Sequence, residues 1–350
     1  MIILTVILYV MLFQKFCKDR HIKMSTRKGY KTALGKYADF NNVSIDFLIS
    51  EAIDDENDRI PLKDRKIKKR LLDFRTHLIN SDLSQNSVKT YFSKIKSFYR
   101  HFEVEIPYLP DAQYEKTYET NYFDLPTKEH ILRALEISSI DLKAVILFMA
   151  SSGTAKSETL SLKVKDFFDA ASDYHNGGSV KEILMSLEKR RDIIPTFYLK
   201  RLKTGKYYYT FCSTEASEAI IKYLKTRWDL KLSDPLFDFS SSSLMARFQK
   251  INDSMDWGFK GSFRFFRSHS LRKFHASNIG LSAEYVDALQ GRSKSIIHQT
   301  YIKTNPQKLK EMYESVMGNV LINASSKSEV HQEFTIVVNV FMSGKELNIF

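Results

Sequence analysis

The stretch from His269 to Lys303 constrains the fold most, because its reactive side chains must return to one place. His269 and Arg272 are three residues apart, and residues with this spacing lie on one face of a helix. Arg292 and Tyr301 follow after a short helical segment and a turn-like Gly-Arg-Ser-Lys-Ser sequence. The pattern therefore predicts that an imidazole, two guanidinium groups and a phenol share one site.

This set of side chains suits the attack of a tyrosine hydroxyl on a phosphodiester. A guanidinium presents paired donors to the non-bridging phosphate oxygens, where negative charge grows in the transition state. Tyrosine serves as a covalent nucleophile when a neighbouring group activates it. Taken singly, an H-x-x-R pattern or one of the 18 tyrosines carries little information. Their order and spacing within a basic chain make the combined pattern a strong signal.

The stretch resembles the C-terminal signature of the tyrosine recombinases, the phage-integrase family. Members of that family carry H-x-x-R, then G-H, G-W or G-R, and then the nucleophilic tyrosine. The matching residues are His269-Ser270-Leu271-Arg272, Gly291-Arg292 and Tyr301, nine residues after Arg292. The resemblance implies a mainly α-helical protein with a small β-sheet, in which a helical core-binding domain precedes an α+β catalytic domain.

An earlier segment departs from the family pattern at one position. The family's first box reads T-G-x-R-x-S-E-x-x-x-L, and Ala155 stands here in place of its arginine, whereas Ser157, Glu158 and Leu162 agree with the box. Lys156 follows directly, and a shift by one residue turns a helical side chain by about 100°. Lysine can reach back toward a phosphate, but as a point charge without the fork of arginine. We predict that Lys156 replaces the missing cation; a weakened site and an arginine borrowed from elsewhere are the alternatives.

Two aromatic segments predict strands at 197–201 and 207–211, joined by a turn that contains Gly205. In the family this hairpin carries the catalytic lysine in a K-T-G motif, and the match is Lys203, with Lys206 as the second candidate. A lysine there can protonate the departing 5′ oxygen of DNA.

The chain of 350 residues is long enough for two domains. Basic amphipathic helices near the N-terminus resemble the family's core-binding domain, which clamps one side of duplex DNA, and the acidic segment 51–58 is predicted to be a loop facing away from phosphate. Two prolines at 107 and 110 indicate a linker. The predicted division is 1–105 core-binding domain, 106–125 linker, 126–320 catalytic domain and 321–350 tail, with a strand at 333–341 that docks on a neighbouring protomer or in cis.

Composition agrees with a nucleic-acid partner. The formal net charge of +12 and the pI of about 9.3 favour binding to a polyanion. Cys17 and Cys212 are far apart in sequence, which predicts reduced thiols in the cytoplasm. Residues 1–13 are almost all apolar, but the run is short for a membrane span and lacks signal-peptide features, so we interpret it as a core helix rather than a membrane anchor.

The resemblance implies a site-specific recombinase that joins Tyr301 to the 3′ phosphate of cleaved DNA. Lys203 would protonate the 5′ oxygen, Arg272, Arg292 and Lys156 would hold the phosphate oxygens, and His269 would assist. Arg264 and Arg267 are candidates for further phosphate contacts. The implied partner is double-stranded DNA with a specific attachment site, bound by a homo-oligomer, a tetramer, with no cofactor and no metal.

Two other functions remain open on the sequence. One is a recombinase relative that binds DNA but is catalytically impaired because of Ala155, since phosphate contacts supply affinity regardless of cleavage. The other is a nicking-closing enzyme similar to the type IB topoisomerases, which reseals the same strand. Arg292 and an apparent insertion at 169–192 suggest a member distant from the bacterial type, such as an archaeal or archaeal-virus recombinase.

Overall fold

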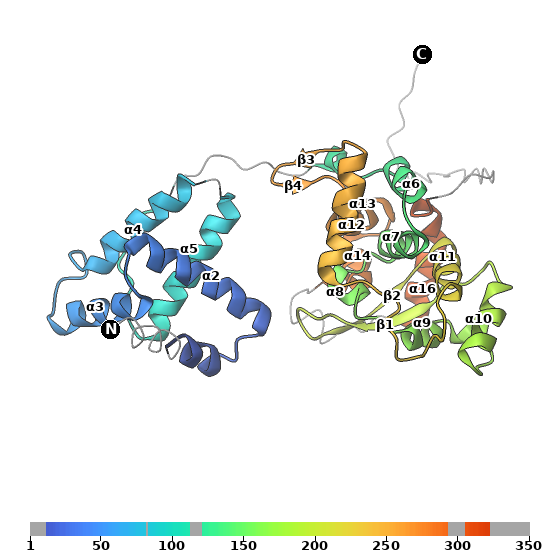
Figure 1. The fold of residues 1–350 in the computed structure, drawn as a ribbon, viewed down its shortest axis with the longest axis horizontal. Coiled ribbons are helices and arrows are strands. Elements are labelled where there is room, and N and C mark those ends of the chain that lie inside the picture. Colours follow the sequence, from blue (N-terminus) through green and yellow to red (C-terminus); the bar gives the residue numbers. More distant parts are fainter. Residues whose placement is uncertain (1–11, 82, 113–120, 293–304, 323–350) are drawn as a thin grey trace, which may run out of the picture. The chain divides into compact units, whose positions relative to one another are not determined.

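The computed structural model describes residues 12–81, 83–112, 121–292 and 305–322. The chain divides into two compact units, Met1–Glu119 and Thr120–Phe350 (Figure 1). The division falls inside the stretch 106–125 that the sequence predicts as a linker.

The first unit is built from helices around an aromatic core. Two of its helices start at side-chain caps: the Ser44 and Ser84 side chains accept hydrogen bonds from the backbone N–H groups of Phe47 and Ser87, at 3.1 and 3.3 Å. The aromatic rings in the core pack edge to face, as in the Tyr37–Phe74 pair with centroids 5.0 Å apart. The helices are α2 (Met24–Asn41), α3 (Ile45–Asn57), α4 (Lys66–Ile79) and α5 (Gln85–His101).

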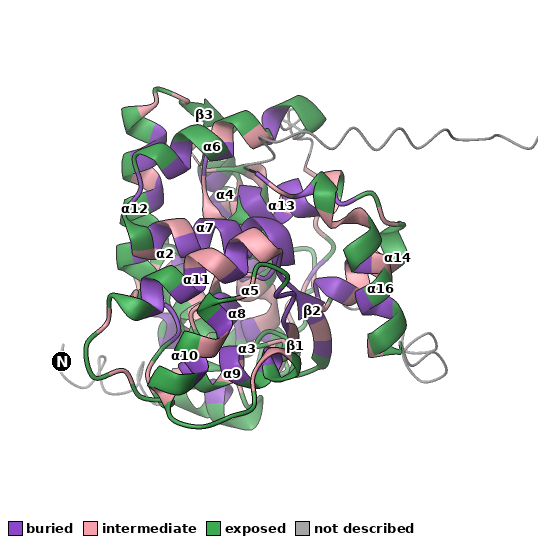
Figure 2. Cartoon of the chain, turned by 90° about the vertical axis from the view of Figure 1, so that its right-hand side faces the viewer, coloured by how far each residue is buried: buried purple, intermediate pink, exposed green. Residues whose placement is uncertain are grey.

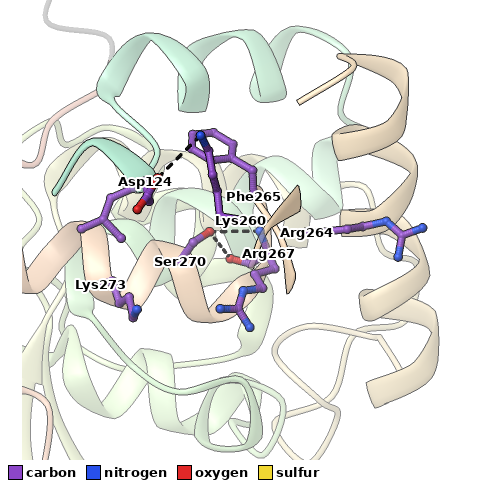
Figure 3. Close-up of a pocket in the computed structure, with 8 residues that line it drawn as sticks. Asp124, Lys260, Arg264, Phe265, Arg267, Ser270 and Lys273 are labelled. Carbon is purple, nitrogen blue, oxygen red and sulfur yellow. Dashed lines mark hydrogen bonds and ion pairs between the residues drawn. The ribbon is translucent and has the colours of Figure 1, made fainter. Parts of the chain in front are cut away.

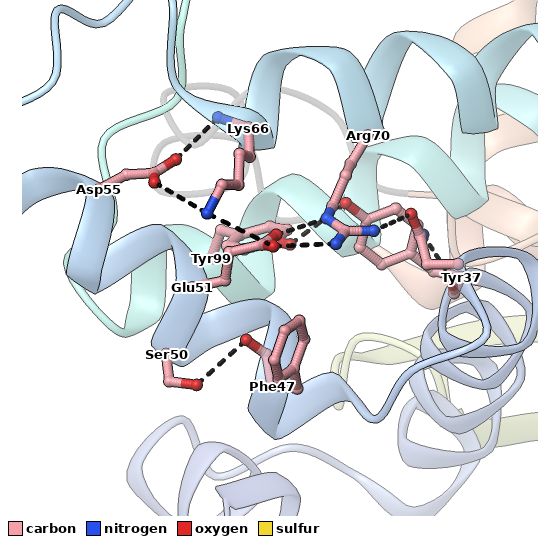
Figure 4. A network of polar contacts seen from close by, with 9 residues as sticks. Tyr37, Phe47, Ser50, Glu51, Asp55, Lys66, Arg70 and Tyr99 are labelled. Carbon is pink, nitrogen blue, oxygen red and sulfur yellow. Dashed lines mark hydrogen bonds and ion pairs between the residues drawn. The ribbon is translucent and has the colours of Figure 1, made fainter.

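The acidic segment 51–58 is not a loop, so that prediction is wrong. Most of it belongs to α3, and the carboxylates of Glu51 and Asp55 are buried, whereas Asp54 and Asp58 remain exposed (Figure 4). Glu51 is 9% exposed and accepts from Arg70 Nη2 at 2.9 Å, while Asp55 is 2% exposed and accepts from the backbone N–H of Lys66 at 2.7 Å. Basic partners on α4 make this acidic helix possible, and such long-range pairing has no local sequence signal.

The second unit combines many short helices with two hairpins. Several helices begin at residues that favour a helix start: Thr127 caps one, and Pro306 stands in the first turn of another. The elements are η1 (Tyr122–Asp124), α6 (Lys128–Glu136), α7 (Ile140–Ser152), α8 (Lys156–Thr159), α9 (Val164–Ala170), η2 (Ser172–Tyr174), α10 (Val180–Glu188), β1 (Thr196–Lys200), β2 (Tyr207–Phe211), α11 (Thr214–Lys225), α12 (Ser241–Ser254), β3 (Phe259–Lys260), β4 (Phe263–Arg264), α13 (Ser268–Asn278), α14 (Ala283–Leu289), α16 (Pro306–Val316) and η3 (Met317–Asn319).

Helix α7 forms the centre of the second unit. From Leu142 to Ser152 all of its residues except Lys143 are buried (Figure 2). A helix that is apolar all round has no face for solvent and must be covered on every side. Helices α11 and α13 pack against it and supply much of that cover. The C-terminal end of α7 is therefore fixed in position by the packing of the core.

The predicted aromatic hairpin is confirmed. Strands β1 and β2 pair antiparallel with Thr196 opposite Phe211 and Lys200 opposite Tyr207. Strands β3 and β4 form a second, very short hairpin that the sequence did not predict. Within the described ranges the protein is mainly helical with little sheet, so the predicted fold class is confirmed.

Two predictions fall partly or wholly outside the described residues. They concern the apolar N-terminus, of which residues 1–11 are not described, and the strand predicted at 333–341. In the part of the chain that is described, no helix is both long and apolar enough to cross a membrane.

Candidate active site

Helix α13 carries both residues of the H-x-x-R pattern. At its start the Arg267 N–H donates to Ser270 Oγ (3.0 Å), and the Ser270 hydroxyl donates to the Arg267 carbonyl (2.8 Å). Leu271 and Phe274 are fully buried and belong to the core around α7. With one face fixed in this way, Arg272 is directed into the protein, while His269 is exposed.

The Arg272 guanidinium is buried against the C-terminal end of α7. Only 4% of the residue is exposed. Its Nη1 donates to the Gly153 carbonyl at 2.6 Å, and its Nη2 donates to the Gln290 carbonyl at 2.7 Å. Among the described residues it forms no ion pair with a carboxylate. A buried cation that is held only by neutral carbonyls is costly unless an anion joins it.

Glycines permit this close approach of three segments. Gly153 has φ +63 and ends α7, and a Cβ there would lie 2.6 Å from His275 Nδ1 and 2.7 Å from Gln290 Nε2. Gly291 has φ +58, and a Cβ there would lie 2.5 Å from Cδ1 of Tyr208 on β2. Both positions require glycine for the backbone conformation and for the space.

A second buried contact fixes the same corner. The Gln290 amide nitrogen donates to the Arg272 carbonyl (3.1 Å) and to His275 Nδ1 (2.9 Å). The Arg272 carbonyl can only accept, which orients the Gln290 amide nitrogen toward it and assigns the proton of His275 to Nε2, an atom with no hydrogen-bond partner among the described residues. Burial, with added effects of Arg272 and Arg292, lowers the pKa of His275 to about 3. The residue is therefore a neutral structural element at neutral pH.

Two further guanidinium groups act electrostatically on Arg272. Burial and then the charges of Arg201 and Arg292 lower the pKa of Arg272 to about 10. The guanidinium is therefore less basic than an exposed arginine. The Tyr208 hydroxyl belongs to the same cluster and has no hydrogen-bond partner among the described residues. The local excess of positive charge indicates a site for an anion with several oxygen atoms.

The hairpin side of this cluster is held by a buried carboxylate. Glu158 on α8 is 2% exposed; it accepts from Arg201 Nη1 at 2.7 Å and from the Leu202 backbone N–H at 3.2 Å. These bonds tie the turn between β1 and β2 to the helix after α7. Lys203, the next residue in that turn, is exposed.

His269 and Arg292 complete the other side. Although His269 is exposed, partial desolvation of its ring and the charges of Arg267 and Lys273 lower its pKa below the ordinary value of 6.5. Arg292 follows α14; its N–H donates to the Asp287 carbonyl at 2.9 Å, and its guanidinium lies 3.5 Å from the Asp287 carboxylate. The Arg292 side chain is 42% exposed, so this ion pair leaves it accessible to a ligand.

No family model and no curated protein sequence matches the chain. Solved structures do match it. The lambda integrase dimer bound to a COC' core site covers 85% of this chain and 97% of its own, with a TM-score of 0.51 and 14% identity. The lambda integrase tetramer bound to a Holliday junction covers 85% and 77%, with a TM-score of 0.51 and 14% identity. The XerH recombinase bound to its difH substrate covers 85% and 82%, with a TM-score of 0.47 and 16% identity.

The chain has the tyrosine recombinase fold. This confirms the resemblance that the sequence suggested, at the level of the fold.

Within the tyrosine recombinase fold, three of the predicted site residues share one electrostatic environment. The charges of Arg272 and Arg292 both act on the pKa of His269. Lys203 lies in the exposed turn after β1, and Lys156 is the half-buried first residue of α8. Tyr301, the predicted nucleophile, lies outside the described residues.

Sequence reasoning missed Arg201 and Tyr208 as members of the site. Both were assigned only to strands, and Arg201 directly follows β1. The available signals were weak: Arg201 stands two residues before Lys203, and Tyr208 is one of three consecutive tyrosines. Neither signal has a meaning without the Glu158 contact and the packing of Tyr208 beneath Gly291.

Further cations lie at the start of α13 in this fold. Figure 3 shows Arg267 and Lys273 extending to the same side of the helix, while Arg264 points away and donates to Asp253 on α12 at 2.9 and 3.2 Å. Arg267 stacks over the Phe263 ring at 4.1 Å. Lys260 forms an ion pair with the buried Asp124 at 3.6 Å. Of the two arginines predicted here, Arg267 is the one without a carboxylate partner among the described residues.

Proposed function

We propose that the protein is a site-specific DNA recombinase that cuts and rejoins strands through a 3′-phosphotyrosyl intermediate. The observation that carries this proposal is the buried Arg272 guanidinium, which neutral carbonyls hold and which Arg201 and Arg292 adjoin. A phosphodiester oxygen supplies the negative charge that this cluster lacks. As phosphorus becomes five-coordinate, a further negative charge develops there, so fixed guanidinium groups stabilise the transition state more than the bound substrate.

The predicted residues then take distinct roles. The Tyr301 hydroxyl loses its proton and attacks phosphorus, the bond from phosphorus to the 5′ oxygen breaks, and Lys203 gives its proton to that oxygen. Arg272 and Arg292 bind the non-bridging oxygens, and Lys156 adds a positive charge. His269, kept neutral by its lowered pKa, accepts the proton of the Tyr301 hydroxyl or donates an N–H hydrogen bond to a phosphate oxygen.

The phosphotyrosyl ester conserves the energy of the broken phosphodiester. A 5′ hydroxyl from a second duplex attacks phosphorus, Tyr301 leaves and regains a proton, and a new strand is joined. In this proposal the cleavage and rejoining of strands require neither a nucleotide nor a metal ion. Assembly of the protein as a tetramer on two duplexes that carry specific attachment sites belongs to the same proposal.

Tyr208 is a poor candidate for the nucleophile, although it lies beside Arg272. It is only 7% exposed. Burial, followed by the charge of Glu158, raises its pKa, so the reactive phenolate is disfavoured. This supports the assignment of the nucleophile to Tyr301.

Covalent trapping tests the proposal. Nicked duplexes selected by binding from a pool with a randomised centre are incubated with the protein without metal, so that the short fragment diffuses away after cleavage. We expect an adduct on a denaturing gel with the wild type and with Tyr108→Phe, whose side chain is 80% exposed in the first unit, but not with Tyr301→Phe.

Two other outcomes would replace the proposal. Binding of the selected duplexes without any adduct would leave a DNA-binding recombinase relative, with Ala155 as the simplest cause. A nicking-closing enzyme would be indicated by a different set of results. The protein would form the adduct and relax supercoiled plasmid as a monomer, but it would not join two duplexes.

A further inference from the structure

We propose that Arg201 supplies the guanidinium that Ala155 lacks and is a third phosphate-binding arginine of this site, beside Arg272 and Arg292. The proposal rests on the recombinase function proposed above. It selects one of the possibilities that the sequence left open, an arginine taken from another part of the chain.

The first support is where the Arg201 side chain ends. Its Nη1 donates to Glu158 at 2.7 Å, and the two side chains are 16% and 2% exposed. Glu158 stands three residues after Ala155, on the single turn of α8. The Arg201 guanidinium therefore reaches the turn on which the family carries its own arginine, although it comes from the hairpin.

The second support is that the Arg201 backbone is held on both sides. Its N–H donates to the Lys206 carbonyl at 2.6 Å, and its carbonyl accepts from Gly205 at 2.7 Å and from Thr204 at 3.2 Å. The neighbouring Leu202 N–H is bound to Glu158. A side chain anchored at its base and at its tip is preorganised, as transition-state stabilisation requires.

The third support is unused hydrogen-bonding capacity next to Arg272. In the described part of the chain, Nε and Nη2 of Arg201 have no hydrogen-bond partner, so they can bind phosphate oxygens while Nη1 keeps Glu158. Of the neighbouring charges, that of Arg201 has the largest effect on Arg272, ahead of Arg292. The two guanidinium groups thus belong to one positively charged cluster.

Lys156 does not have these properties. It is half-buried at the start of α8, and no residue within the described ranges forms an ion pair or hydrogen bond with its ammonium group. A flexible ammonium contributes a point charge, whereas the Arg201 fork matches two oxygens at once. We therefore assign the oriented contacts to Arg201 and only a general positive charge to Lys156.

Glu158 acts as a positioning residue in this arrangement. It neutralises one of the three arginine charges of Arg201, Arg272 and Arg292, which lowers the cost of burying them before DNA arrives. It also couples Arg201 to the turn that carries Lys203. Phosphate binding and proton delivery are consequently aligned by one carboxylate.

The experiment measures single-turnover formation of the Tyr301 adduct at saturating nicked duplex. We expect Arg201→Ala to slow the reaction on the order of 100-fold, as for the loss of one oriented donor, with little change in DNA affinity. Lys156→Ala should cost less than about fivefold, because it removes a point charge that no hydrogen bond orients. Adding Ala155→Arg to Arg201→Ala returns a guanidinium to α8 and should restore most of the rate.

Arg201→Ala leaves Glu158 buried and unpaired, so folding needs its own control. Arg201→Ala combined with Glu158→Gln removes that charge, and Arg201→Lys keeps an ammonium partner but loses the fork; both should remain slow while melting near the wild-type temperature. Arg191→Ala removes an exposed arginine, 4.0 Å from Glu218, and should leave the rate unchanged.

Substrate chemistry separates Arg201 from Lys203. A 5′-bridging sulfur makes a leaving group that needs no proton, so it should rescue Lys203→Ala but not Arg201→Ala. A neutral methylphosphonate at the scissile position should reduce the defect of Arg201→Ala. Normal rates for the Arg201 variants beside an active wild type would overturn this inference alone, whereas absence of any wild-type adduct would overturn the proposed function.

Discussion

In the first unit, the buried carboxylates of Glu51 and Asp55 face basic groups from α4, whereas in the second unit the buried Arg272 guanidinium faces backbone carbonyls. In the Glu51–Arg70 pair the two opposite charges neutralise each other within the fold (Figure 4). The cluster of Arg272, Arg201 and Arg292 contains more positive than negative charge. A buried charge that is paired within the fold needs no ligand, whereas a buried charge without a counter-charge leaves a place for an anion.

The largest expected effect concerns Arg272, whose charge is not neutralised within the fold. Arg272→Ala should slow formation of the Tyr301 adduct on the order of 1,000-fold, because a fixed donor to the growing phosphate charge is lost. Its thermal stability should fall only moderately, because removal of the buried positive charge partly offsets the two carbonyls left without a donor. Single-turnover cleavage and calorimetry measure the two quantities. A large fall in melting temperature without a catalytic defect would make Arg272 a structural residue.

For the neutralised Glu51–Arg70 pair we expect the reverse, a loss of stability without a loss of activity. Arg70→Ala removes both hydrogen bonds from Arg70 to the buried Glu51, leaves only Lys66 Nζ at 4.0 Å, and should reduce the free energy of unfolding by about 3 kcal/mol. Adduct formation per folded molecule should stay near the wild-type rate. Urea unfolding measures the loss, with Arg133→Ala as the control because its i,i+4 pair with Glu129 is exposed on both sides. Equal stabilities for the two variants would contradict the comparison.

The neutral His275 beside Arg272 should make stability depend on pH. Its pKa is about 3 in the folded protein and about 6.5 when unfolded, so below pH 6.5 the unfolded chain binds a proton that the native state does not. Stability is therefore lost as pH falls from 6.5 toward 3, by about 1.4 kcal/mol per pH unit from this residue. In His275→Gln the slope should flatten by that amount, while His21→Asn, at an exposed histidine, should not change it. An unchanged slope in His275→Gln would show that this histidine titrates normally.

The smallest effect concerns His269 at the edge of the cluster. Because desolvation and neighbouring cations lower its pKa, the neutral imidazole persists below pH 6.5 and activity should decline only at more acidic pH. His269→Gln should remove this acidic limb and slow the reaction at neutral pH by about tenfold, less than a typical full general-base contribution. A pH–rate profile of adduct formation measures both. An inflection above pH 6.5 in the wild type would contradict the lowered pKa.

Much of the fold could be predicted because its signals are local. Ser84 and Thr127 cap the helices that follow them, Pro306 opens another, and the aromatic hairpin contains a glycine in its turn. Each of these depends on residues within a few positions of one another. The acidic part of α3 was missed because its partners, Arg70 and Lys66, lie on another helix and a local pattern of carboxylates favours solvent.

The sequence by itself determined the residue types of the site and their order: H-x-x-R on one helix, Gly291-Arg292, and a lysine in a hairpin turn. Only the tertiary structure decided how these groups are buried and charged. Glu158 and Arg201 are 43 residues apart, and Arg272 and Gly153 are 119 apart, so no local rule relates them. Packing of α13 against α7 and docking of the hairpin onto α8 bring these residues together. The buried core fixes the positions of these elements, and therefore of the side chains that they carry.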